Sequence, residues 1–140
     1  MNQAAPDRGS RPVDARRREY LGEERGNREA AAVRAIASAR RDRDRLIGRE
    51  LFADPAWDML LALYAASLAQ RRLSTSELVL AAAVPATTGL RWMDKLESLG
   101  LLIRRGDPLD ARRVWVGLSR EGESRMRALF DALRHGRLPI

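Results

Sequence analysis

The stretch over residues 96–119 constrains the fold more than any other part of the chain. An apolar helical stripe ends at Leu99, and Gly100 follows at the position just past a helix end where glycine is favoured. Two strand-like segments then flank Asp107-Pro108, a dipeptide typical of a turn. A helix, a short arginine-rich hairpin and a new helix start predict a winged helix-turn-helix fold that is mainly α with a small β-hairpin wing.

Composition fits one domain and excludes several kinds of site. The chain has 140 residues, 45% of them hydrophobic, which suffices for a single modest core. With no cysteine, disulfides, thiolate metal sites and cysteine redox sensing are excluded, and the lone His135 fits a helix C-terminus better than a metal site. No apolar run is long enough to span a membrane and no signal-peptide pattern is present, so we expect a cytoplasmic protein without membrane contact.

Positive charge is concentrated at the hairpin. The chain carries 26 Lys and Arg against 19 Asp and Glu, a net charge of +7. Between residues 101 and 120 there are five arginines and only two aspartates. This clustering favours a polyanionic partner such as nucleic acid. By total charge alone, a merely soluble basic protein is an equal alternative.

The first part of the chain divides at residue 27. Residues 1–27 contain proline, glycine and mixed charges, and we expect a flexible basic tail with at most a helical turn around Arg16–Leu21. Residues 28–140 are expected to form the winged-helix domain, beginning with a helix over Arg28–Phe52 that is available for dimerisation. Its charged run over residues 40–45 places Arg40 and Arg41 at helical spacing from Asp44, which predicts ion pairs on a solvated face.

Two helices precede the predicted DNA-reading helix. An apolar stripe at helical spacing predicts an amphipathic helix from Pro55 to about Arg71, with these core residues: Trp57, Leu60, Leu61, Tyr64 and Leu68. Ser74-Thr75-Ser76-Glu77 forms a capping-box pattern that opens a short helix to about Ala83.

The last two helices flank the hairpin. The helix from Pro85 to Leu99 is expected to turn these residues inward: Gly89, Met93, Leu96 and Leu99. Ser119 is expected to cap a final helix, whose apolar stripe over Met126–Leu133 packs on the domain or on a partner subunit.

The hairpin sequence resembles the wing of MarR-type winged helix-turn-helix regulators. Those wings carry Asp-Pro-x-Asp-x-Arg, then a strand and Leu-Thr-x-x-Gly. This chain has Asp107-Pro108-Leu109-Asp110-Ala111-Arg112, then Val114-Trp115-Val116, then Leu118-Ser119-Arg120-Glu121-Gly122. The resemblance covers about Ala56–Leu129. It implies a bacterial transcriptional regulator that binds double-stranded DNA as a dimer, with Asp110 orienting Arg112. Few residues follow Ser119, whereas the family usually continues with a longer pair of helices.

The candidate DNA-binding residues lie on the Pro85–Leu99 helix and on the hairpin. The helix, expected in the major groove, exposes Thr87, Thr88, Leu90, Arg91 and Lys95. Hydroxyls near its N-terminus suit phosphates, Arg91 suits a guanine edge and Leu90 suits a thymine methyl. The hairpin, expected at the minor groove and backbone, contributes Arg104, Arg105, Asp110, Arg112 and Arg113.

Other functions remain open on the sequence alone. An exposed Leu90 and Trp92 would fit a winged-helix protein-interaction module without DNA binding, and the basic hairpin would also fit structured RNA. The sequence contains no catalytic constellation, so we expect neither an enzyme nor a cofactor, and nothing in it identifies a small-molecule effector. We expect a homodimer through the apolar faces of the Arg28–Phe52 helix and the Met126–Leu133 stripe, because neither has an obvious partner within so small a domain.

Overall fold

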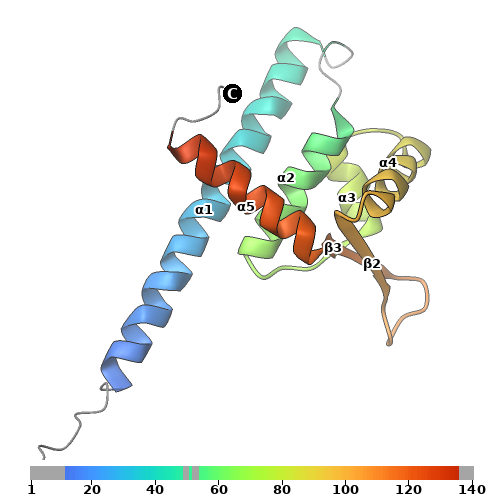
Figure 1. Cartoon of the computed structure of the whole chain (residues 1–140). Helices are drawn as coiled ribbons and strands as arrows, with labels where there is room; N and C mark the ends of the chain where they lie inside the picture. The colour runs from blue at the N-terminus through green and yellow to red at the C-terminus, as the bar shows by residue number, and fades with distance from the viewer. Residues whose placement is uncertain (1–11, 49–50, 52–53, 136–140) are drawn as a thin grey trace, which may run out of the picture.

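A computed structural model describes residues 12–48, 51 and 54–135 of the chain. This part of the chain forms helices around a small antiparallel sheet (Figure 1). The helices are α1 (Pro12–Ile47), α2 (Pro55–Leu68), α3 (Thr75–Ala82), α4 (Ala86–Ser98) and α5 (Arg120–Arg134). The strands are β1 (Leu73–Ser74), β2 (Leu102–Gly106) and β3 (Val114–Leu118). The predicted mainly helical winged fold is confirmed.

The sheet has the strand order β1-β3-β2. Leu73 pairs with Val116, while Leu102 pairs with Leu118, so one face of the sheet carries apolar side chains. Leu73, Leu102 and Val116 are buried on that face. Because successive residues of a strand point to opposite faces, the residues between them lie on the outer face of the sheet.

Helix α2 is the centre of the core. Asp54 caps it by accepting a 3.2 Å hydrogen bond from the Trp57 amide, and it ends at Leu68, slightly before the expected Arg71. The predicted single apolar stripe is too narrow a description, because α2 is buried on two sides. Met59 and Leu63 pack toward the sheet and α4, whereas Leu61 and Tyr64 pack toward α1 and α5.

Helix α1 starts much earlier than expected. The prediction of a flexible tail is wrong for residues 12–27, which form the first part of one continuous helix; residues 1–11 lie outside the described part. Arginine, glutamate and alanine are good helix formers, and they outweigh Gly22 and Gly26. Helix α1 passes close to the end of α2 here, since a Cβ at Gly26 would lie 3.7 Å from the Leu68 carbonyl oxygen, an ordinary van der Waals distance.

The N-terminal part of α1 projects away from the body of the molecule (Figure 1). The expected helix over Arg28–Phe52 ends at Ile47, and residues 49, 50 and 52 of that range lie outside the described part. No helix in the described ranges is both long and apolar enough to cross a membrane.

The charged run over residues 40–45 of α1 forms an ion pair with α2 as well as one within α1. Arg40 Nε donates a 2.7 Å hydrogen bond to Asp58, and Asp44 pairs with Arg43 at 2.7 Å. The predicted pairs of Arg40 and Arg41 with Asp44 are therefore wrong. The reason is that the long Arg40 side chain reaches across the helix interface, where its side chain and that of Asp58 are only 16% and 18% exposed.

Helix α5 closes a second apolar cluster with α1 and α2. Val33, Leu61, Tyr64, Met126 and Phe130 are buried together, and the rings of Tyr64 and Phe130 are 5.3 Å apart. The apolar faces of α1 and α5 thus do have partners within the chain. The argument that these faces needed a second subunit is wrong, because α2 lies between them.

Candidate nucleic-acid interface

Helices α3 and α4 form a tight helix-turn-helix. The predicted capping box is confirmed: Ser74 Oγ accepts from the Glu77 amide at 3.2 Å, and the Glu77 carboxylate accepts from the Ser74 amide at 2.8 Å. Ala83, at φ 54°, turns the chain between the helices. Gly89 is buried where α4 meets α3, since a Cβ there would lie 2.8 Å from Val79 Cγ2. Glycine therefore sets the close approach of the two helices.

Helix α4 buries one face and exposes the other. Gly89, Met93 and Leu96 face the core as expected. Leu99 does not, because α4 ends at Ser98 and Leu99 is 57% exposed. Trp92 packs against the apolar core and is only partly exposed. This weakens the alternative that α4 presents an apolar surface to a protein partner. The candidate residues on the other face are exposed except for the half-buried Thr88: Thr87, Leu90, Arg91 and Lys95.

The wing consists of β2, β3 and the loop over residues 107–113. The side chains of two aspartates shape this loop, as Asp107 accepts from the Leu109 amide at 2.8 Å and Asp110 accepts from the Arg112 amide at 3.0 Å. The Asp107 amide donates to the Arg113 carbonyl at 2.9 Å and closes the loop. Such local bonds between aspartate side chains and backbone amides fix turns.

Arg112 lies at the tip of the wing and points into solvent. Its side chain is 93% exposed, and its Nε lies 3.5 Å from the Asp110 carboxylate. This exposed contact contributes little to stability, since exposed ion pairs are worth about 0–1 kcal/mol. Asp110 instead holds the arginine backbone and biases the direction of its guanidinium.

Three further arginines surround the outer face of the wing. Arg105 is exposed beside Trp115, its partner across the strands. The guanidiniums of Arg113 and Arg72 lie 5.2 and 5.6 Å from the centre of the Trp115 ring, within the range of cation–π attraction. Sequence reasoning missed Arg72, because the two-residue strand β1 that brings it to the wing has no recognisable sequence pattern.

Arg104 differs from the other arginines of the wing. Its side chain turns toward α4, where Asp94 accepts a hydrogen bond from it and Glu97 accepts another at 2.9 Å. These hydrogen bonds, first that of Asp94 and then that of Glu97, raise the pKa of Arg104. The Arg104 guanidinium therefore binds two carboxylates of α4 and is largely covered, whereas that of Arg112 has one longer contact and is exposed.

The end of the wing is joined to α5 by a close backbone contact. Ser119 Oγ donates a 2.5 Å hydrogen bond to the Gly100 carbonyl and accepts from the Gly122 amide at 2.9 Å. The predicted Ser119 cap is confirmed. Gly122 is packed on the backbone, because a Cβ there would lie 2.2 Å from the Leu101 carbonyl oxygen.

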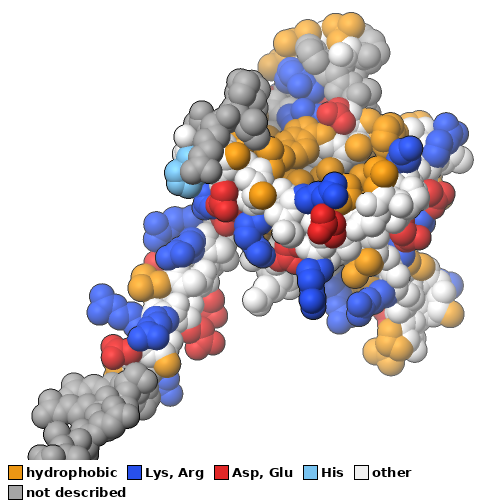
Figure 2. All heavy atoms as spheres, viewed as in Figure 1, with side chains coloured by type: hydrophobic (Ala, Val, Ile, Leu, Met, Phe, Trp, Pro, Cys, Tyr) orange, Lys and Arg blue, Asp and Glu red, His pale blue; other side chains and the backbone are white. Residues whose placement is uncertain are grey.

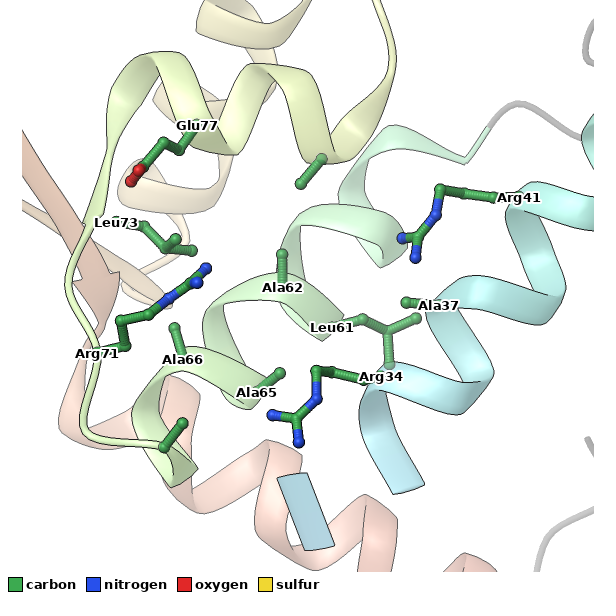
Figure 3. A pocket seen from close by; sticks show the side chains of 12 residues that line it. Arg34, Ala37, Arg41, Leu61, Ala62, Ala65, Ala66, Arg71, Leu73 and Glu77 are labelled. Carbon is green, nitrogen blue, oxygen red and sulfur yellow. The ribbon is translucent and has the colours of Figure 1, made fainter. Parts of the chain in front are cut away.

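A pocket of about 340 Å³ lies between α1, α2 and α3. Figure 3 shows alanines of α2 at its base, with Arg34 and Arg41 reaching from α1 and Arg71 from the segment after α2. On one side the pocket is bounded by the long helix α1 and on another by α3, the first helix of the helix-turn-helix. Among the residues with described positions, no cluster of three or more His, Asp or Glu side chains could hold a metal ion.

Comparison with known proteins identifies the fold. No family profile matches the sequence, and no curated protein matches it. The solved DNA complex of MepR from S. aureus is similar in structure, with a TM-score of 0.54 and 22% identity over 73% of this chain and 82% of that chain. The transcriptional regulator PA4135 matches with a TM-score of 0.51 and 19% identity over 75% of this chain and 73% of that chain.

A mutant MepR from a multidrug-resistant S. aureus isolate also matches, with a TM-score of 0.50 and 23% identity. That match covers 61% of this chain and 64% of the mutant, slightly less than two thirds of its length. The three-stranded sheet with its wing, the helix-turn-helix and these similarities agree with the wing motif: the chain has the winged helix-turn-helix fold of the MarR-type regulators.

Proposed function

We propose that this chain binds double-stranded DNA through α4 and the wing and thereby regulates transcription. The observation that carries the proposal is the pairing of an exposed polar face on α4 with the exposed Arg112 at the wing tip. In winged helices, such a helix enters the major groove while the wing contacts the adjacent minor groove and backbone. The similarity in fold to MepR, which has been solved bound to DNA, supports the same use here.

Helix α4 would supply both phosphate contacts and base contacts. Its N-cap, Pro85, makes no side-chain cap, so the first amides of α4 are available for a phosphate together with Thr87 and Thr88. Arg91, one turn further along, would reach a guanine edge, and the exposed Leu90 would touch a thymine methyl. Lys95 lies near the end of the exposed face and suits a backbone phosphate.

The wing would hold the duplex by charge. Arg112 is assigned to the minor groove, with Asp110 setting its direction. Arg105 and Arg113 are exposed on the wing and suit neighbouring phosphates. The proposal involves no catalysis and no cofactor, and it places the chain in the cytoplasm.

A salt titration of duplex binding tests the proposal. Each phosphate contact contributes about −0.9 to the slope of log affinity against log salt, so the wild-type slope should be steep. Arg112→Ala should weaken binding to any duplex by about 1–3 kcal/mol if its groove contact is desolvated. Arg125→Ala is the matched control, because it removes an exposed arginine that also pairs with a carboxylate, but on α5. Undetectable binding at low salt, or equal effects of the two variants, would reject the DNA-binding function.

We further propose a homodimer that uses the end of α1. Leu46, Ile47 and Leu51 are 75%, 62% and 66% exposed. Figure 2 shows apolar side chains at the top of the view, where α1 ends. Burial of these side chains in a second copy would remove apolar surface from water. Ile47→Glu should shift light scattering toward the monomer mass, whereas Leu109→Glu, at a wing position that is 95% exposed, should not. A monomeric wild-type chain at tens of micromolar would contradict the dimer.

A further inference from the structure

Arg104 lies on the inner side of the wing. Along β2, Leu102 faces the core, and Arg104, two residues on, faces the same side and reaches α4. Arg105 lies on the opposite face and has an exposed side chain. Two neighbouring arginines of the same strand therefore have different surroundings, one facing protein carboxylates and the other facing solvent.

The partners of Arg104 are carboxylates on the helix that would enter the DNA groove. Asp94 and Glu97 are three residues apart on α4, so both side chains lie on one face of the helix. Their side chains are 68% and 45% exposed. Two carboxylates on this helix repel a phosphate backbone, and Glu97 adds a negative charge near the negative end of the helix dipole.

The Arg104 guanidinium binds both carboxylates at once. Its Nε donates to Glu97 and one of its terminal nitrogens donates to Asp94. A planar fork can serve two acceptors at once, which a lysine ammonium does with less directional preference. The Arg104 side chain is only 24% exposed, so little of it is left to contact a ligand.

We propose that Arg104 promotes DNA binding through Asp94 and Glu97, by neutralising these carboxylates and holding them against the wing, and not by contact with DNA. The inference rests on the proposed function. It assigns different roles to Arg104 and Arg105, although both are arginines of the basic wing.

The test compares affinities and salt slopes for a duplex of fixed sequence. Arg104→Ala should lower affinity by about tenfold, because the two carboxylates lose their counter-charge, and should leave the salt slope unchanged. Adding Asp94→Asn and Glu97→Gln to Arg104→Ala should restore affinity to within about threefold of wild type, because the repulsive charges are gone. Arg105→Ala is the control, and it should lower the magnitude of the slope by about 0.9.

Circular dichroism establishes that each variant is folded. If Arg104→Ala unfolds, Arg104→Gln replaces it, because glutamine keeps a donor for the carboxylates. A slope reduced by about 0.9 in Arg104→Ala, with no recovery in the triple variant, would mean that Arg104 contacts a phosphate and would overturn the inference. Unchanged affinity in Arg104→Ala would also overturn it. Absence of duplex binding by the wild-type chain would instead remove the proposed function, and this inference with it.

Discussion

The hydroxyl of Tyr64 on α2 donates a 3.1 Å hydrogen bond to the carboxylate of Glu29 on α1. The Tyr64 ring is fully buried beside Phe130 of α5, and Arg134 of α5 lies 3.9 Å from the same carboxylate. Three helices therefore meet at one polar contact within an apolar cluster. Burial, followed by the charge of Glu29, raises the pKa of Tyr64 to about 12.

This contact predicts an alkaline loss of stability. Tyr64 has an ordinary pKa of 10.0, and its folded-state pKa is higher, so its neutral form is favoured by folding. The resulting stability is complete below pH 10.0 and is lost as the pH rises toward about 12. Tyr64→Phe should cost about 1 kcal/mol at neutral pH and lack this alkaline component, as measured by urea unfolding across pH. Tyr20→Phe, at a 61% exposed position, should behave as wild type. Equal alkaline losses in Tyr64→Phe and wild type would contradict the assignment.

Two helical glycines should respond in opposite ways to alanine. Gly122→Ala forces a methyl group against the Leu101 carbonyl oxygen and should destabilise the fold by about 2–4 kcal/mol. Gly22→Ala has nothing within 4 Å of the new methyl group and should stabilise α1 by about 0.5–1 kcal/mol. Thermal unfolding of the two variants measures both effects. A stable Gly122→Ala variant would show that α5 can move away from the end of the wing.

The partly buried ion pair between α1 and α2 should matter more than exposed pairs. Asp58→Ala leaves the Arg40 guanidinium, whose side chain is 16% exposed, without its 2.7 Å partner and should cost about 1–3 kcal/mol. Glu24→Ala, which breaks an exposed pair with Arg28 on α1, should cost less than about 0.5 kcal/mol. Chemical denaturation gives both values. Replacing both partners, as Arg40→Met with Asp58→Leu, should recover most of the loss, and failure to recover would assign the cost to packing instead.

Arg91 and Lys95 should separate base reading from backbone binding. Because Arg91 is assigned to a base edge, Arg91→Ala should reduce the preference for a selected operator over random duplex by about 1–3 kcal/mol. Lys95→Ala should weaken operator and random duplex alike, since a phosphate contact carries no sequence information. Anisotropy titrations at one salt concentration, with an operator selected from a random duplex library, measure both. Equal losses of preference in the two variants would contradict these separate roles.

The parts of the fold that sequence predicted well depend on local chemistry. Gly100 has φ 74°, which favours glycine, and the capping box at Ser74 uses residues only three apart. These signals predicted α3, α4 and the wing with small errors at their ends. The start of α1 is not predicted in this way, because proline, glycine and mixed charges in its first part favour a tail, whereas the residues around them are good helix formers and continue the helix from Pro12.

In the candidate site, too, some features could be predicted from the sequence and others could not. The exposed face of α4 follows from helical periodicity, and Arg112 is singled out by the resemblance of the hairpin to the MarR-type wing motif. The partners of Arg104 do not follow from either, since hydrogen bonds from β2 to α4 require the three-dimensional register of strand and helix. Charge counts along the sequence treat all arginines of the wing alike, whereas the fold separates them.

The position of Trp115 gives the wing an intrinsic optical probe. The guanidiniums of Arg72 and Arg113 both lie within 5.6 Å of the centre of its ring, and indole fluorescence is sensitive to nearby charge. Movement of Arg113 toward a phosphate would withdraw one cation from the ring and alter the emission without any added label. With Trp57 and Trp92 replaced by phenylalanine, the rate at which the wing engages a duplex could be followed by stopped-flow fluorescence from this single residue.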